Sequence, residues 1–190
     1  MAATETNWTA EMVRALPEDG KRYECIDGEL LVSTTPEVTH QRAVGEMYYR
    51  LRLALDPLRQ VEVLTSPADI ELEPTTLVQP DVFVCPQNTR RGMHQWSDIA
   101  SLHVAIEVLS PSTARVDRVK KRRFFARVGV PQYWVVDCAS EVIEVSTPAD
   151  ASVTVLDDVL RWSPPAGGPD FVLDLPVYFR YVATLELPES

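Results

Sequence analysis

The sequence predicts an α/β (α+β) protein with a mixed central sheet flanked by helices. Two amphipathic segments, 40–55 and 113–128, have the period of helices, and short runs of aliphatic and β-branched residues lie between and after them. The second helix lies between two apolar runs, 102–109 and 133–137, which is the order of a βαβ unit. Further strand-like runs on both sides of this core predict extra N-terminal and C-terminal strands.

The composition is that of an ordinary globular protein of 190 residues, 45% hydrophobic and 24% charged. Its longest uncharged apolar run is too short to span a membrane, and its N-terminus lacks the features of a secretory signal. Cys25, Cys85 and Cys138 are too few and too far apart for a disulfide framework or a zinc knuckle. We therefore expect one domain over residues 1–190, located in the reducing cytoplasm and without membrane contact.

Three helices are expected, over 8–16, 40–55 and 113–128. On the helix over 40–55 the apolar side chains share one face, and His40 lies on that face at the helix start. Glu46 and Arg50 fall on the opposite face, which predicts that both point into solvent. The last helix has Ser112 or Thr113 as its N-cap and ends at Gly129, with Pro131 blocking its continuation.

Short strands account for most of the remaining chain. The clearest signal is Asp27-Gly28, a dipeptide typical of two-residue hairpin turns. The polar stretch 86–101 predicts an exposed loop with one helical turn. The expected strands, in order, are 22–26, 29–33, 61–64, 69–73, 78–84, 102–109, 133–137, 142–145, 153–156 and one near Phe171, followed by a closing segment near 177–181.

The charge is unevenly distributed along the chain. The formal net charge is −10, yet the segment from Arg115 to Arg127 alone carries +6, which leaves −16 on the remainder. A basic helix on an acidic protein can bind a phosphate backbone locally. The alternative is a solvated helix face that acidic neighbours balance, and the sequence leaves both interpretations open.

Two acids lie inside apolar strands. Asp81 follows Pro80 at the start of one strand, and Glu107 lies in the strand 102–109, neither face of which is plainly polar. Two buried carboxylates on neighbouring strands repel each other unless a cation lies between them. Oxygen ligands of this kind suit Mg²⁺ or Mn²⁺ better than zinc.

Lys121 is the one basic residue of its helix that points toward the sheet. At 100° per residue it falls in the middle of the apolar face, whereas Lys120, Arg122 and Arg123 fall 100° or more away. A buried ammonium needs an acid or a reacting group, and Asp117 one turn earlier is a candidate partner. The alternative is a lysine whose stem is buried and whose ion pair is only structural.

Together these residues resemble a known family. The resemblance rests on Pro80-Asp81, on 106–113 (IEVLSPST), on the pair Asp117 and Lys121, and on 129–134 (GVPQYW). These stretches resemble the Uma-type family of bacterial restriction-endonuclease-like proteins, within the PD-(D/E)XK nuclease superfamily. The turn 27–30 and His40 also match the family, and the similarity covers about residues 22–180.

The resemblance implies a restriction-endonuclease-like fold with a divalent-metal site. It implies that Asp81, Glu107 and the carbonyl of Val108 bind Mg²⁺ (or Mn²⁺) and that Lys121 completes the catalytic set. The sequence departs from the superfamily pattern because Leu109 occupies the usual position of the lysine. Phe125 and Gln132 also replace a usual tyrosine and a usual glutamate, and the accessory residues expected are Glu29, His40 and Asp117.

The predicted function is metal-dependent endonucleolytic hydrolysis of nucleic acid, with DNA as the expected partner. The phosphate contacts expected from the basic helix are Arg118, Lys120, Arg122 and Arg123. A homodimer is also expected, since nucleases that cut both strands often dimerise. The main alternative is a nuclease fold that only binds nucleic acid or a protein; a serine hydrolase built from Ser110 or Ser112 with His40 or His103 lacks a nucleophile-elbow pattern.

Overall fold

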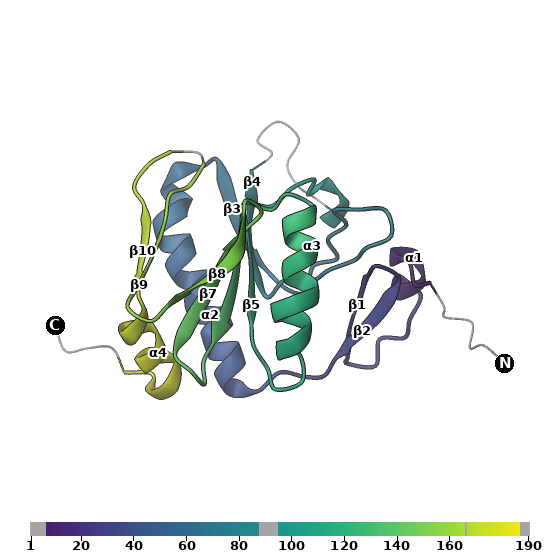
Figure 1. Cartoon of the computed structure of the whole chain (residues 1–190), viewed down its shortest axis with the longest axis horizontal. Coiled ribbons are helices and arrows are strands. Elements are labelled where there is room, and N and C mark those ends of the chain that lie inside the picture. The colour runs from purple at the N-terminus through teal and green to yellow at the C-terminus, as the bar shows by residue number, and fades with distance from the viewer. Residues whose placement is uncertain (1–6, 88–94, 166, 187–190) are drawn as a thin grey trace.

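The computed structural model of the chain describes residues 7–87, 95–165 and 167–186. Its centre is a mixed sheet (Figure 1) of six strands. Within this sheet only the β5–β6 pair is parallel. This arrangement confirms the predicted class. The strands, in spatial order, are β3 (Val61–Thr65), β4 (Val82–Pro86), β5 (Val104–Val108), β6 (Gln132–Asp137), β7 (Val142–Thr147) and β8 (Asp150–Leu156).

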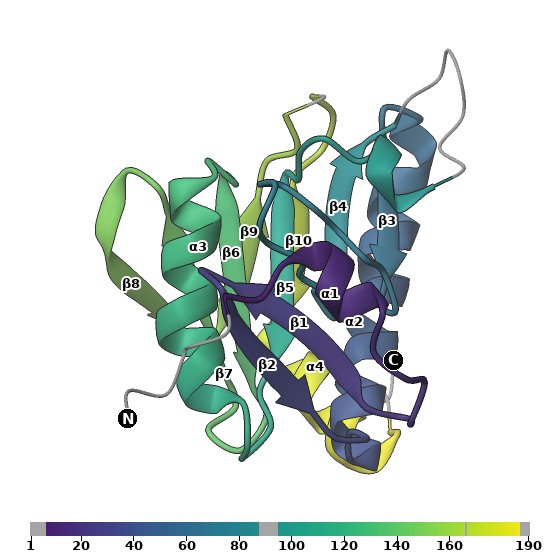
Figure 2. The same ribbon diagram turned by 90° about the vertical axis from the view of Figure 1, so that its right-hand side faces the viewer.

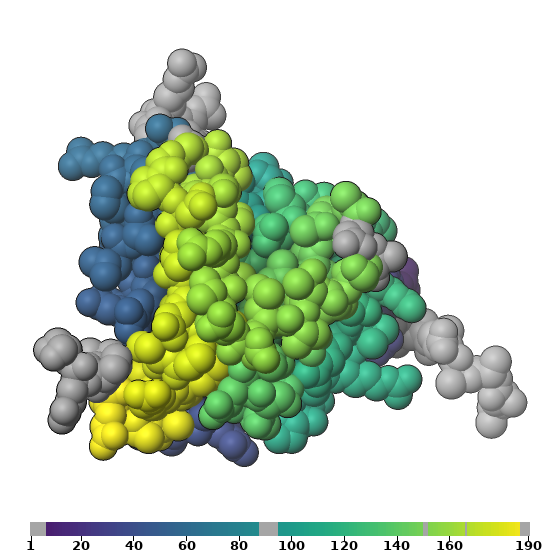
Figure 3. Space-filling model, turned by 60° about the vertical axis from the view of Figure 1, so that its left-hand side comes forward, coloured from purple at the N-terminus to yellow at the C-terminus, as the bar shows by residue number. Residues whose placement is uncertain are grey.

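Helices cover the two faces of this sheet (Figure 1). On one face lie α2 (Val38–Leu55), α4 (Leu175–Thr184) and the hairpin of β9 (Val159–Trp162) and β10 (Phe171–Asp174). Their buried side chains form one large hydrophobic cluster with the sheet, and Figure 3 shows α4 and this hairpin beside α2 on the surface. On the other face α3 (Arg122–Arg127) buries Phe124 and Phe125 in a second cluster.

The predicted N-terminal hairpin is confirmed residue for residue. β1 (Arg22–Ile26) pairs with β2 (Glu29–Ser33) around Asp27-Gly28, whose φ angles of 53° and 76° are those of a tight hairpin turn. The hairpin is separate from the central sheet and lies near α1 (Ala10–Arg14) on the same side as α3 (Figure 2). Its edge meets the core through a bridge between Cys25 and Leu77.

The helix over 40–55 is also confirmed, with one error in its outer face. As predicted, its apolar side chains and His40 point inward. Glu46 was expected in solvent, but it is only 7% exposed, and Arg50 donates to it over 2.6 Å. The reason is α4, which packs beside α2 on that face; the Tyr178 hydroxyl donates to the Ala43 carbonyl.

Several other expectations need correction. The segment 69–73 forms no strand, because Ile70 makes only an isolated bridge with Val78. β9 was not predicted, and the closing segment 177–181 lies within the helix α4, which the side chain of Asp174 caps. The helical turn expected within 86–101 is Trp96–Asp98, although part of that loop lies outside the described residues. No described helix has the length and apolar character needed to cross a membrane.

The basic helix opens with a π-helical segment, Val116–Lys121 (η3), before it continues as α3. The Asp117 carbonyl accepts the N–H of Arg122, five residues later, and also the hydroxyl of Tyr133 over 3.1 Å. Such wide turns are frequent at functional sites. Asp117 and Lys121, the two candidate site residues of this helix, both lie within it and are both buried.

Candidate active site

The two strand acids lie side by side. Val82 of β4 pairs with Ile106 of β5, so the next antiparallel neighbours are Asp81 and Glu107. Their side chains are 3% and 1% exposed. The N–H of Val108 donates to Asp81 Oδ2 over 2.9 Å, which ties the first acid to the strand that carries the second. The structure therefore brings together the two carboxylates that the sequence singled out.

The Asp81 carboxylate has two further partners from outside the sheet. Arg22 Nη1 of β1 lies 2.7 Å from Oδ1, and His40 Nε2 of α2 lies 3.1 Å from Oδ2. Burial by itself raises the pKa of Asp81, but the hydrogen bond from His40 and the charge of Arg22 outweigh burial and hold the pKa below its usual value. Asp81 is therefore ionised at neutral pH.

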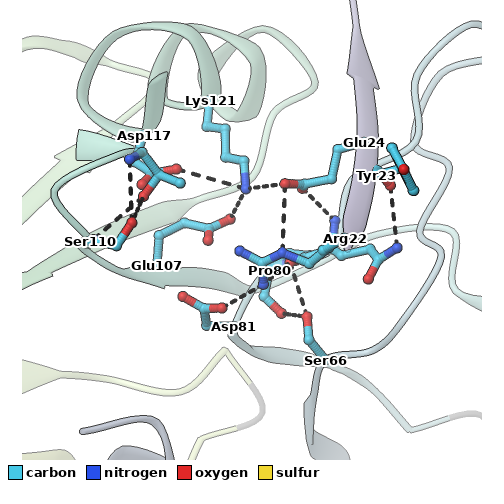
Figure 4. Close-up of polar contacts among 12 residues, drawn as sticks. Arg22, Tyr23, Glu24, Ser66, Pro80, Asp81, Glu107, Ser110, Asp117 and Lys121 are labelled. Carbon is cyan, nitrogen blue, oxygen red and sulfur yellow. Dashed lines mark hydrogen bonds and ion pairs between the residues drawn. The ribbon is translucent and has the colours of Figure 1, made fainter. Parts of the chain in front are cut away.

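Lys121 reaches from the π-helical segment into a group of three carboxylates (Figure 4). Its Nζ lies 2.8 Å from Glu107 Oε1, 2.8 Å from Glu24 Oε2 and 3.7 Å from Asp117 Oδ1. Burial opposes the charged form of this lysine, but the three carboxylates outweigh burial and raise its pKa above the usual value. The ammonium is thus permanently charged, and the three carboxylates provide its ion-pair partners.

Negative charge exceeds positive charge in this cluster. Besides His40, it contains four carboxyl groups and two permanent cations; the members are Glu24, Asp81, Glu107, Asp117, Arg22 and Lys121. Burial raises the pKa of Glu107 well above its usual value, and neighbouring Asp81, Asp117 and Glu24 add to this effect against the attraction of Lys121. A further cation beside Glu107 would stabilise its ionised form and lower its pKa.

The donor set fits a divalent cation that prefers oxygen. Asp81 and Glu107 offer carboxylate oxygens from adjacent strands, and with all four carboxyl groups ionised the cluster would have two negative charges more than its two cations balance. Across the described part of the chain, no three Asp, Glu, His or Cys side chains converge as a complete ligand set. Mg²⁺ tolerates such a partial set, because it commonly keeps several waters and uses one or two carboxylates plus substrate oxygens.

Sequence reasoning missed two residues of the site, Arg22 and Glu24. Glu24 is the acid among them. It is 1% exposed, and besides Lys121 it accepts the backbone N–H of Gln79 over 2.7 Å. The available signal was an acid between Tyr23 and Cys25 in a predicted strand, which is the same kind of signal that identified Glu107. The docking of the hairpin onto the site, however, is a tertiary contact that the local sequence does not specify.

The accessory candidates lie in different places. His40 contacts Asp81 directly, and Asp117 lies at the edge of the Lys121 cluster. Glu29 lies outside the site, because its side chain is 64% exposed and pairs with Lys120 at the surface. The hairpin does contribute an acid to the site, but the acid is Glu24 and not Glu29.

The basic helix is largely paired with acids. Arg118 lies 2.7 Å from Asp137 and 2.7 Å from Glu144, and Lys120 is held by Glu29. Arg122 is half-buried, Arg123 is exposed, and within the described residues neither of them forms an ion pair. Of the four residues predicted to contact phosphate, Arg122 and Arg123 are therefore the two whose charge is not paired with an acid of the described chain.

A cavity of about 860 Å³ leads from the surface to Asp81. Its walls come from α1, the β1–β2 hairpin, the start of α2 and the segment after β5, and Arg22 and His40 line it together with Asp81. Ser110 and Ser112 also line it, but their hydroxyls lie 3.1 Å apart and bond to each other. Among the described residues neither serine hydroxyl bonds to His40, whose Nδ1 has no hydrogen-bond partner, or to His103. The serine-hydrolase alternative therefore lacks a base beside its nucleophile.

Comparison with known proteins identifies the family and supports the fold. Residues 10–176 match the Uma2 family, described as "Putative restriction endonuclease", and no curated protein matches the sequence. The crystal structure of "a putative nuclease belonging to DUF820" from Anabaena variabilis ATCC 29413 is similar in fold, with a TM-score of 0.74 and 19% identity over 92% of this chain and 98% of that chain. Because the family match extends over most of the sequence, the chain belongs to the Uma2 family.

Proposed function

We propose that this protein hydrolyses phosphodiester bonds of nucleic acid, with DNA as the substrate, in a reaction that depends on a divalent metal ion. The observation that carries the proposal is the buried set of Asp81, Glu107 and Lys121 with its excess of negative charge. Membership of a family described as "Putative restriction endonuclease" supports it. An acid cluster of this kind would be a costly feature in a protein that had no cation to bind.

Asp81, Glu107 and the carbonyl of Val108 would hold Mg²⁺ or Mn²⁺. When bound, such an ion polarises the phosphodiester and lowers the pKa of a coordinated water. The protein's own residues fix these ligands, since Arg22, His40 and the Val108 N–H orient Asp81. Lys121 orients Glu107 and offsets the charge of the surrounding acids.

The family resemblance also implies a lysine that helps the attacking water, and Lys121 is the candidate for that role. It is 2% exposed and surrounded by Glu107, Glu24 and Asp117, and it does not line the cavity. Its role in this proposal is therefore to favour the ionised form of Glu107 against the burial that raises the pKa of that group. Asp117 supports that role from the same π-helical segment.

The test is a cleavage assay on supercoiled plasmid and on a single-stranded oligonucleotide, with Mg²⁺ or Mn²⁺, for wild type and Glu107→Gln. Removal of one charged group from such a site lowers the rate by about 100-fold or more. The matched control is Glu62→Gln, an acid of the neighbouring strand β3 outside the cluster, which should cut at the wild-type rate. Equal rates for wild type and Glu107→Gln would refute the proposal.

A second candidate function is binding without catalysis, to nucleic acid or to a protein partner. Two observations favour it: Leu109 occupies the position of the usual lysine, and Arg22 already occupies one oxygen of Asp81. A degenerate site of this kind would bind neither Mg²⁺ nor Mn²⁺. Retention of an oligonucleotide without metal uptake and without cleavage would select this function over hydrolysis.

A further inference from the structure

We propose that Arg22, and not Lys121, is the cation that contacts the phosphate group of the substrate. This inference rests on the proposed function, because it concerns the same site and assigns one more residue that touches substrate. The starting observation is the cavity that leads to Asp81. A phosphodiester has to pass through this cavity to reach the strand acids, since those acids are buried.

Only part of the charged cluster reaches the cavity. Asp81, Arg22 and His40 line it, whereas Glu24, Glu107, Asp117 and Lys121 lie behind them. The side chain of Arg22 is 23% exposed, compared with 2% for Lys121. Arg22 is therefore the cation of the cluster that an incoming anion meets first.

The guanidinium of Arg22 has donors left for a ligand. Its Nη1 contacts Asp81 Oδ1 over 2.7 Å and the Gln79 carbonyl over 3.4 Å, and its Nε lies 4.0 Å from Glu24 Oε2. Among the described residues, Nη2 has no hydrogen-bond partner. A guanidinium presents five N–H donors in a planar fork that matches the oxygens of a phosphate group.

The other cations of the cavity are held at its rim. Arg14 lies 3.7 Å from Asp69 and also bonds Glu71, and Lys21 lies 2.7 Å from Asp19. Neither of them contacts Asp81. Among the permanent cations that line the cavity, Arg22 alone combines contact with a proposed metal ligand, exposure to the cavity and an unused donor edge.

The charge of Arg22 should affect the binding of a metal ion and the binding of a phosphate group in opposite directions. Its positive charge on Asp81 Oδ1 disfavours a second cation at that oxygen, while the same charge attracts an anion. Removal of the guanidinium should therefore weaken phosphate binding and leave metal binding unchanged or stronger. A residue that merely held the site in shape would lose both affinities together.

The experiment measures both affinities by calorimetry for wild type, Arg22→Gln and Arg22→Lys. The probes are Mn²⁺ alone and, without metal, thymidine 3′,5′-bisphosphate. For Arg22→Gln we expect bisphosphate affinity to fall by about 10- to 100-fold, which is the loss expected when one hydrogen bond between charged groups is removed. We expect the Mn²⁺ affinity of the same variant to equal or exceed that of the wild type. Arg22→Lys keeps the charge but not the fork, so its bisphosphate affinity should lie between the two.

The matched control is Arg52→Gln, which removes a guanidinium from the surface pair with Asp56 on α2 and should change neither affinity. Thermal unfolding by circular dichroism identifies variants that are not folded, and if Arg22→Gln is one of them, Arg22→Lys decides. Unchanged bisphosphate affinity in the folded variant, or a parallel loss of Mn²⁺ and bisphosphate, would overturn the inference. So would wild-type protein that binds Mn²⁺ but no bisphosphate. If the wild type binds the bisphosphate but takes up no Mn²⁺ and cuts no DNA, the proposed hydrolysis fails, and the bisphosphate affinity of Arg22→Gln alone decides the inference: a loss supports it and an unchanged value overturns it.

Discussion

Replacement of Lys121 by methionine should destabilise the protein strongly. Lys121 Nζ lies 2.8 Å from both Glu107 and Glu24, and all three side chains are at most 2% exposed. The methionine side chain is of similar size, so the change removes the charge with little loss of packing. Removal of one partner from a buried ion pair costs about 3–5 kcal/mol, a large part of the roughly 5–15 kcal/mol that stabilises a typical domain.

Urea unfolding followed by circular dichroism measures this loss. With a slope of about 2 kcal/mol per molar, the midpoint should fall by roughly 2 M. Addition of Glu107→Gln to Lys121→Met should recover part of the loss, with a coupling of about 1–3 kcal/mol. The control Lys21→Met removes an exposed lysine paired with Asp19 and should leave the midpoint unchanged. A wild-type midpoint for Lys121→Met, or strictly additive effects in the double variant, would refute the reasoning.

Three further predictions concern neighbouring groups. Glu24→Gln should lower the free energy of unfolding in urea by about 1–3 kcal/mol, because a neutral amide no longer balances the charge of Lys121. A loss as small as that of Glu62→Gln would contradict this prediction. Asp137→Asn should cost about 1–2 kcal/mol at pH 7, where the acid accepts bonds from Arg118 and Ser140. Those contacts hold the pKa of Asp137 below its usual value of 3.8, so its contribution is present above pH 3.8 and is lost as the pH falls through the folded-state pKa. A difference from wild type that does not shrink as the pH is lowered below 3.8 would count against this prediction. Arg123→Gln should reduce the salt dependence of oligonucleotide binding by about one unit of slope, whereas Arg127→Gln, already paired with Asp27 and Glu73, should not.

Local signals predicted those parts of the fold whose partners are close in sequence. The hairpin followed from Asp27-Gly28, and α2 followed from the spacing of its apolar residues. Alternation alone was misleading at 69–73, where no neighbouring strand continues the pairing beyond Ile70. The prediction that Glu46 points into solvent was wrong because a helical wheel describes one helix by itself. It cannot show that α4 covers the outer face of α2.

The candidate site divides in a similar way. Asp81, Glu107 and Lys121 were found because charged residues in apolar patterns need partners, and the structure brings all three into one buried cluster. The wheel placed Lys121 inward even though a π-helical segment changes the local rotation. The roles of Arg22 and Glu24 depend on how a hairpin docks from outside the sheet, and no periodicity in the sequence encodes that contact.

Titration of Mn²⁺ into the purified protein, with wild type and Glu107→Gln compared by calorimetry, tests the central claim most directly. The account predicts saturable binding to the wild type, because two carboxylates and an excess of negative charge meet at Asp81 and Glu107. It predicts much weaker binding to Glu107→Gln, which keeps the shape of the side chain but removes the charged ligand. Absence of binding to the wild type, or equal binding to the two proteins, would contradict it.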